Sequence, residues 1–304
     1  MDRAVAERVR VHVALIAVAV LFSLNYIVSK LAMHAIAPLA FAWLRVAGAA
    51  VAMQILFRQR GAAPLERSDR VRIVVYAILG VVLNQSLFLG GLSLTSAHVA
   101  AILMTTIPPF ALAAAIAVGR ERATIARTGG IALALAGALL LVGSEGFEGA
   151  TRSFIGDLLL TANAFCYALY LVLAKPMMAR ISARRFIAAI FGVGALLMIP
   201  ICAPAMVRQP WRSVPAGAWI GLLVVIAGPT VAAYLLNAWA LRYADSSLVA
   251  TYTYAQPVIT TVLAAAFLGE SIGASAVIAA VLIFTGVWLA GTRTGRKRQG
   301  SPAV

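Results

Sequence analysis

Long apolar runs recur along the whole chain, each close to the ~20 residues that an α-helix needs to cross a lipid bilayer. Only 12% of the residues are charged, about half the share found in soluble domains. A chain with so few charges cannot cover a water-exposed surface, and the sequence therefore predicts an all-α polytopic membrane protein. Ten transmembrane helices are predicted, at residues 11–32, 39–57, 71–91, 98–118, 127–143, 155–175, 185–204, 216–238, 247–268 and 274–291.

The distribution of Lys and Arg predicts how these helices are oriented. With ten helices both chain ends lie on one side of the membrane, and twenty basic residues fall on that side. Three basic residues fall on the other side, namely Arg152, Arg208 and Arg212. Cytoplasmic loops of membrane proteins carry the excess of basic residues. We therefore expect a protein of the inner membrane with both termini in the cytoplasm. The net charge of +15 is thus explained by topology, and no nucleic acid partner is expected.

The second half of the chain repeats the first. A shift of 149 residues superimposes Leu92 on Leu241, Pro108 on Pro257, Glu121 on Glu270 and Gly137 on Gly286. A weaker match at a shift of 145 places Asn25 on Tyr170 and Lys30 on Lys175. Residues 1–150 and 151–304 would each hold five helices. An odd number forces the second half to enter the membrane from the opposite face, which predicts two inverted repeats, an arrangement typical of transporters.

These paired motifs resemble the ten-helix EamA-type transporters of the drug/metabolite transporter superfamily. The resemblance covers nearly the whole chain. It rests on the segments Leu92 to Gly137 and Leu241 to Gly286, each with a mid-helix proline, a glutamate after that helix and a glycine in the last helix. The first copy differs in having Arg120 where the second has Gly269. Such a resemblance implies export of amino acids or other metabolites, or transport of nucleotide sugars or sugar phosphates.

Polar and aromatic side chains follow one face of several predicted helices. Such residues in a membrane usually face the bundle interior or a cavity, so they are predicted to bind substrate, although interhelical hydrogen bonding is the alternative. Thr230 lies on the same predicted helix face as Tyr234 and Asn237. The predicted substrate-binding residues are Asn25, Lys30, Asn84, Gln85, Asn163, Tyr167, Tyr170, Tyr234, Asn237, Tyr252 and Gln256.

The charged residues of the helices have different expected roles. Lys30 shares a helix with Asn25 and is a candidate partner for a substrate carboxylate. Arg45 lies about two turns into its helix and is expected to extend to the membrane interface. Glu121 and Glu270 each precede a helix, whose N-terminal dipole favours an acid. For His98 a surface or packing role is expected.

Two prolines are predicted to act as hinges. Pro108 and Pro257 each remove a backbone donor from a helix interior and should kink it. Symmetric kinks suit a hinged gate, and a static bend is the alternative. The Gly228–Pro229 pair is expected to break another helix.

Transport is the function that these features favour. The predicted lining is aromatic and rich in amides, which suits a neutral or aromatic amino acid exported by alternating access. Efflux of drugs or other amphipathic metabolites is the alternative, although drug cations usually require a buried carboxylate. No acid falls in the middle third of a predicted helix, which argues against a carboxylate proton relay.

An enzyme is not expected, since the zinc-protease spacing of histidines and the serine-hydrolase motif are both absent. No filter-like segment indicates a channel, and no metal or cofactor is predicted. The predicted partners are a small-molecule substrate and the lipid bilayer.

Overall fold

The computed structural model describes residues 3–56, 66–147, 151–240, 243, 252 and 254–291. Within these ranges the secondary structure is helical. The first half contains α1 (Arg3–Ala32), α2 (Pro38–Leu56), α3 (Arg67–Ala77), η1 (Ile78–Leu83), α4 (Asn84–Leu92), α5 (Ala97–Met104), α6 (Ile107–Ala117) and α7 (Ile125–Phe147). The second half contains α8 (Thr151–Arg180), α9 (Ala183–Arg208), η2 (Trp211–Ser213), α10 (Ala216–Val225), η3 (Ile226–Ala232), α11 (Ala233–Ala240), α13 (Ala255–Leu268) and α14 (Ala274–Gly291).

The helices confirm a polytopic membrane protein. Seven helical segments of the described chain are long and apolar enough to cross a bilayer, and residues 216–232, 255–268 and 274–289 form three shorter apolar helices. The first of these continues without a gap through α11, so helical structure runs from 216 to 240. Most of the start of the helix predicted at 247–268 lies outside the described residues.

Pro108 does not kink a continuous helix, as the sequence had suggested. Instead the helix ends, and a turn at Thr105 and Thr106 separates α5 from α6. Both threonine hydroxyls donate to backbone carbonyls three residues earlier, which compensates for the lost helical bonds. Pro108 therefore lies in the first turn of α6, where a missing backbone N–H removes no bond. Pro257 likewise lies in the first turn of α13.

Two π-helical segments, η1 and η3, widen helices that are otherwise α-helical. The 149-residue shift places η1 at 227–232 (78 + 149 to 83 + 149), inside the bounds of η3. In η3 the wider turn accommodates Pro229, so the predicted break is replaced by a π segment within a continuous helix. The Thr230 hydroxyl donates to the Val225 carbonyl at 2.8 Å, the acceptor that Pro229 would leave unpaired in an α-helix.

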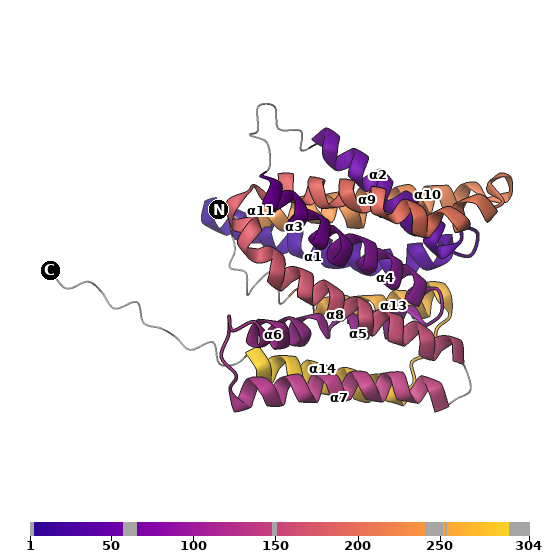
Figure 1. Ribbon diagram of the computed structural model, residues 1–304. Helices are drawn as coiled ribbons and strands as arrows, with labels where there is room; N and C mark the ends of the chain where they lie inside the picture. The colour runs from indigo at the N-terminus through magenta and orange to yellow at the C-terminus, as the bar shows by residue number, and fades with distance from the viewer. Residues whose placement is uncertain are drawn as a thin grey trace.

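Helices of one half pack against helices of the other. α1 packs on α13, and α8 packs on α6. α2 packs on α9, while α7 and α14 form a pair along one edge of the bundle (Figure 1). Within this pair the two helix backbones approach closely at Gly286. An added Cβ would lie 2.5 Å from the Ala134 nitrogen and 2.6 Å from the Gly130 oxygen.

The two helix turns that carry the repeated glutamates have equivalent hydrogen bonds. The Glu121 nitrogen donates to the Ala115 oxygen and the Glu270 nitrogen to the Ala264 oxygen, and both partners are also 149 residues apart. Gly269 adopts a φ of 65° before Glu270. In the first half the left-handed residue is Gly119, one position earlier. This shift explains how Arg120 is tolerated where the second half has a glycine.

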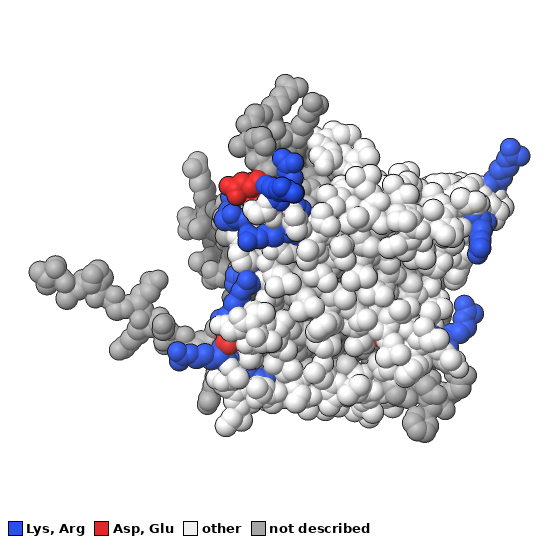
Figure 2. All heavy atoms as spheres, in the orientation of Figure 1, with Lys and Arg blue, Asp and Glu red and all other residues white. Residues whose placement is uncertain are grey.

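The charged side chains of the described residues lie mainly at the two ends of the bundle on the face shown in Figure 2. On the face shown in Figure 2, most Lys and Arg side chains gather at the end where the N-terminus lies in Figure 1, and a few lie at the opposite end. The broad band between them carries almost no charge. Several large apolar side chains of the described helices, such as Leu196, Ile220 and Trp288, are more than half exposed. An uncharged apolar band between two charged ends is the surface that a bilayer requires.

Candidate functional site

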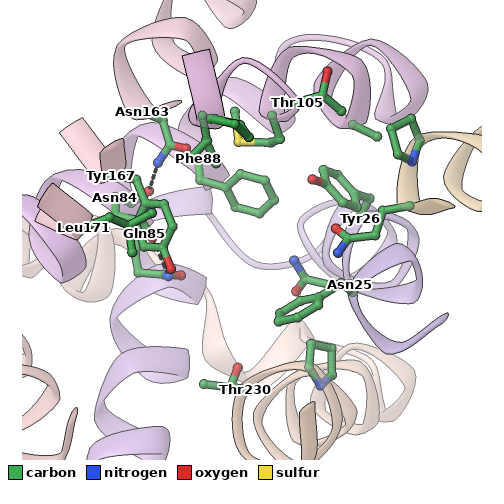
Figure 3. A pocket seen from close by; sticks show the side chains of 18 of the residues that line it. Asn25, Tyr26, Asn84, Gln85, Phe88, Thr105, Asn163, Tyr167, Leu171 and Thr230 are labelled. Atoms are coloured by element: carbon green, nitrogen blue, oxygen red, sulfur yellow. Dashed lines mark hydrogen bonds between the residues drawn. The ribbon is translucent and has the colours of Figure 1, made fainter. Parts of the chain in front are cut away.

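A cavity of about 400 Å³ lies among helices of both halves. Its size is within the range of small-molecule sites. Figure 3 shows polar and aromatic side chains around a central opening. The lining residues are Phe22, Asn25, Tyr26, Arg45, Asn84, Gln85, Phe88, Ala101, Met104, Thr105, Ile107, Pro108, Asn163, Tyr167, Leu171, Phe191, Pro229, Thr230, Tyr254, Gln256 and Pro257.

One wall of the cavity is a cluster of amides beside a tyrosine. Asn84 directly follows η1, and its backbone carbonyl accepts a hydrogen bond from the Asn163 side chain of α8. The Gln85 amide donates to Asn84 Oδ1 at 2.9 Å. Tyr167, one turn after Asn163, lies beside this cluster (Figure 3). The wall thus combines hydrogen-bonding amide groups with an aromatic ring.

The facing wall is formed by α1 and the start of α13. Asn25 and Tyr26 lie across the opening from the amide cluster (Figure 3). Ser29 donates to Asn25 Oδ1 at 3.2 Å, and the Tyr26 ring meets Phe88 edge to face. The Ser23 hydroxyl binds the backbone carbonyl of Gln256 at 3.2 Å, which joins α1 to the turn that carries Pro257. Pro108 and Pro257, the two prolines predicted to act as hinges, both line the cavity.

Arg45 does not extend to the membrane interface, and that expectation was wrong. The residue is only 7% exposed and lines the cavity. Its Nε donates to the Thr230 hydroxyl oxygen at 3.2 Å. The difference arises because α2 packs on η3 and the Arg45 side chain is bonded to Thr230 of η3.

The structure brings six of the predicted substrate-binding residues together at the cavity, namely Asn25, Asn84, Gln85, Asn163, Tyr167 and Gln256. Tyr170 and Tyr252 are not among the lining residues. Tyr170 packs on Gly80 in η1 and stacks on Phe186. Tyr252 forms a 2.6 Å hydrogen bond with His12 Nδ1. The side chains of Tyr234 and Asn237 lie outside the described residues.

Lys30 joins the two halves at the end of the bundle opposite the N-terminus. Its Nζ donates to Glu270 Oε1 at 2.7 Å and to the Thr95 carbonyl at 2.8 Å. Glu270 Oε1 also accepts from the Ala97 nitrogen at 2.8 Å, and Oε2 accepts from the His98 nitrogen and bonds the His98 ring. We call this group of Lys30, Thr95, Ala97, His98 and Glu270 the latch. It connects α1, the start of α5 and the turn after α13.

The latch corrects the role expected for Glu270. The carboxylate caps the N-terminus of α5, a helix of the other half, and not that of the helix that follows it. Burial alone would raise the pKa of Glu270, but hydrogen bonds from His98, Lys30 and the Ala97 nitrogen lower it to about 2. Glu270 is therefore ionised and ion-paired throughout the neutral pH range. His98 is buried and not at the surface, and its ring and backbone nitrogen both bond Glu270.

Sequence reasoning missed several residues of the cavity. Phe22, Phe88, Phe191 and Tyr254 are aromatic residues in apolar stretches, and no pattern separates them from packing residues. Arg45 carried a usable signal, since a charged residue within a transmembrane helix indicates function by default. The pairing of Lys30 with Glu270 spans 240 positions of the sequence and could not be read from helix periodicity.

Several known proteins are similar to this chain along most of its length. The chain is 26% identical over 282 residues to an uncharacterized transporter of Archaeoglobus fulgidus, covering 92% of this chain and 96% of the relative. It is 27% identical over 263 residues to a probable terminal-alkyne amino-acid exporter of Streptantibioticus cattleyicolor, covering 84% and 85%. A WAT1-related protein of Arabidopsis thaliana is 24% identical, with 93% and 84% covered.

A crystal structure shares the fold. It has a TM-score of 0.58 and 20% sequence identity, and the match covers 94% of this chain and 97% of that one. The EamA-like transporter family matches this chain twice, at residues 10–143 and again at 154–292. Together the two matches include nearly the whole sequence, so this chain belongs to the EamA-like transporter family.

Proposed function

We propose that this protein exports small metabolites, above all neutral and aromatic amino acids, through the central cavity. The observation that carries the proposal is the lining itself, whose described residues combine amides, aromatic rings and one cationic side chain, that of Arg45. Amides and one cation suit the zwitterionic head of an amino acid, and the rings suit an apolar side chain. The similarity to a probable amino-acid exporter supports the same substrate class.

Drug efflux is the second candidate. The apolar share of the lining would suit other amphipathic metabolites, but organic cations usually require an acidic partner. None of the described lining residues is an Asp or a Glu. Sugar phosphates are also disfavoured, because Lys30 is engaged in the latch and Arg45 is the one cationic side chain among the described residues of the lining.

The mechanism that we propose is alternating access between two inverted five-helix repeats, residues 1–150 and 151–304. Three observations support the repeat. The same family matches each half. The π segments η1 and η3 coincide after the 149-residue shift. The packing of α1 on α13 has its counterpart in the packing of α8 on α6. Inverted repeats allow one half to rock against the other around a fixed central site.

The distribution of basic residues supports an orientation. The basic end of the bundle would face the cytoplasm of the inner membrane, together with both termini. The latch then lies on the periplasmic side and closes the cavity there. Opening toward the periplasm requires Lys30 to separate from Glu270.

The repeat supplies a counterpart to the latch at the cytoplasmic end. Lys175 occupies the position equivalent to Lys30, and Glu121 the position equivalent to Glu270. Both side chains are exposed here, and the described contacts pair Glu121 with Arg127 at 3.3 Å. We propose that Lys175 and Glu121 pair when the periplasmic side is open, so that one latch forms as the other breaks.

Charge exchange tests this second latch. Lys175→Glu should reduce transport about tenfold, because two acids would then repel across the closed cytoplasmic side. Combining it with Glu121→Lys should restore at least half of the wild-type rate. The rate of uptake into proteoliposomes measures both effects, with Lys175→Met as the control for a neutral side chain. A double variant no faster than the single one would contradict the pairing.

The substrate class is tested by uptake into proteoliposomes with a panel of labelled amino acids and organic cations. The panel is run with imposed and with collapsed proton gradients, which also separates proton coupling from facilitated export. We expect uptake of neutral and aromatic amino acids. Movement of organic cations with no uptake of any amino acid would replace this substrate class by drug efflux.

A further inference from the structure

Arg45 is a buried charge at the wall of a membrane cavity. It lies in α2, is 7% exposed and borders the cavity next to Thr230. Placing a guanidinium within a transmembrane helix is unfavourable even on the most lenient scales. A methionine or leucine would fill the same volume without that cost. Packing alone therefore does not account for an arginine at this position.

The local backbone holds the guanidinium in one orientation. Pro229 removes a donor from η3, and the Thr230 hydroxyl donates to the Val225 carbonyl at 2.8 Å. The hydroxyl hydrogen is thereby committed, and the oxygen accepts from Arg45 Nε at 3.2 Å. This arrangement fixes the Nε edge of the group on η3. The terminal nitrogens belong to a rigid planar fork whose geometry matches a carboxylate.

The charge around the cavity favours an anionic group at this point. Among the described residues that line it, Arg45 is the one with a full charge, and the others are neutral amides, hydroxyls, aromatic rings and apolar groups. Asn25 and Tyr26 line the same cavity. A substrate carboxylate at Arg45 would balance the charge of the cavity and be surrounded by hydrogen-bond donors.

We infer that Arg45 binds the carboxylate of the transported molecule and that Thr230 positions the guanidinium for it. The inference rests on the proposed function and adds a requirement, namely one anionic group on every good substrate. It assigns to Arg45 the role that sequence reasoning had considered for Lys30. Removal of the carboxylate from the substrate and removal of Arg45 from the protein should then have the same effect.

Competition against labelled phenylalanine uptake into proteoliposomes tests this directly. With the wild-type protein, phenylalaninamide should compete about 30-fold more weakly than phenylalanine, because a charge-assisted pair to the guanidinium is lost. With Arg45→Gln, phenylalanine should weaken about 30-fold while the amide changes little, so that the ratio of the two approaches one. Arg45→Lys should retain part of the preference, since it keeps the charge without the planar fork. Thr230→Val should lower the preference less than Arg45→Gln does.

Each outcome separates the role of Arg45 from the proposed function. Equal competition by acid and amide in the wild type overturns the inference without any variant, even if Arg45→Gln does not fold. A variant that weakens both competitors equally and keeps the wild-type ratio shows a structural role and also overturns it. Thermal stabilisation of the purified wild-type protein is measured with the same two compounds. If phenylalanine stabilises the wild type more than its amide does, Arg45→Gln removes this difference and no amino acid is transported, then Arg45 binds a carboxylate as inferred and the proposed function fails.

Discussion

Gly286→Ala is expected to lower the melting temperature of the purified protein by about 10 °C, corresponding to ~3 kcal/mol of overpacking. The added methyl group would lie 2.5 Å from the Ala134 nitrogen and 2.6 Å from the Gly130 oxygen. Both atoms belong to the backbone of α7, which cannot yield as a flexible side chain does. α7 and α14 would have to move apart, with loss of the close packing on which membrane helix pairs depend.

Two further glycines provide the comparison. In Gly137→Ala the new methyl group would lie 2.9 Å from the Ala279 oxygen and two side-chain atoms of α14, so a smaller loss of stability is expected. Gly129→Ala lies in the same helix, α7, with no other atom within 4 Å. It should be neutral or slightly stabilising, because alanine favours a helix over glycine. Thermal unfolding in detergent measures all three, and a Gly286→Ala protein that melts within 2 °C of wild type would contradict the packing argument.

Lys30→Met is expected to open the cavity on the side that, in our proposal, the latch closes. The ion pair is partly exposed, with side-chain exposures of 20% and 11%. We therefore expect a loss of about 2 kcal/mol, less than the ~3–5 kcal/mol for breaking a fully buried pair. That loss shifts the balance between closed and open states about 30-fold. Glu270→Ala should have a larger effect, because the Ala97 and His98 nitrogens would also lose their acceptor.

Thiol labelling measures this shift. Cys166 and Cys202 are free and are first replaced by alanine. Thr105→Cys then places one thiol at the cavity wall. A membrane-impermeant maleimide applied from the latch side should react about 30-fold faster when Lys30 is also methionine. Lys175→Met, at the other end, is the matched control and should not accelerate labelling. Equal labelling rates with and without Lys30 would show that the latch does not close the cavity.

The lowered pKa of Glu270 predicts how the latch responds to pH. Because that pKa is lowered to about 2, the ionised carboxylate stabilises the latch above its ordinary pKa near 4.5. The stabilisation is lost only as the pH falls from there toward 2. Labelling of the Thr105→Cys protein should therefore show no opening of the latch between pH 8 and pH 5.

Much of the fold could be predicted from the sequence. Hydropathy located the apolar helices because the bilayer imposes both their length and their composition. Helix breaks were harder, since Pro108 was assigned to a kink and instead begins a new helix. The π segments were not predicted. A π turn forms where a helix must accommodate one extra residue, as at Pro229. The hydropathy pattern does not indicate such a position.

The candidate site was predictable in part for a geometric reason. Asn163 and Tyr167 lie one turn apart and both reach the cavity. Tyr170, at i+7, was assigned to the same face but packs on Gly80 instead. Two helices that cross at an angle share a cavity over only a turn or two. Helix periodicity therefore assigns more residues of one face to the cavity than actually reach it. Arg45 was misassigned because its burial depends on Thr230 in η3, which lies 185 residues away in the sequence.

Counterflow in proteoliposomes tests the central claim, that a carrier moves neutral amino acids by alternating access. Vesicles loaded with unlabelled phenylalanine are diluted into a trace of labelled phenylalanine, and internal label is followed over time. Alternating access predicts a transient accumulation of label well above its equilibrium level. Each release of unlabelled substrate outside the vesicle leaves the cavity open to the outside, where it binds labelled phenylalanine and carries it inward. Label that rises only to equilibrium, or does not enter at all, would contradict the account.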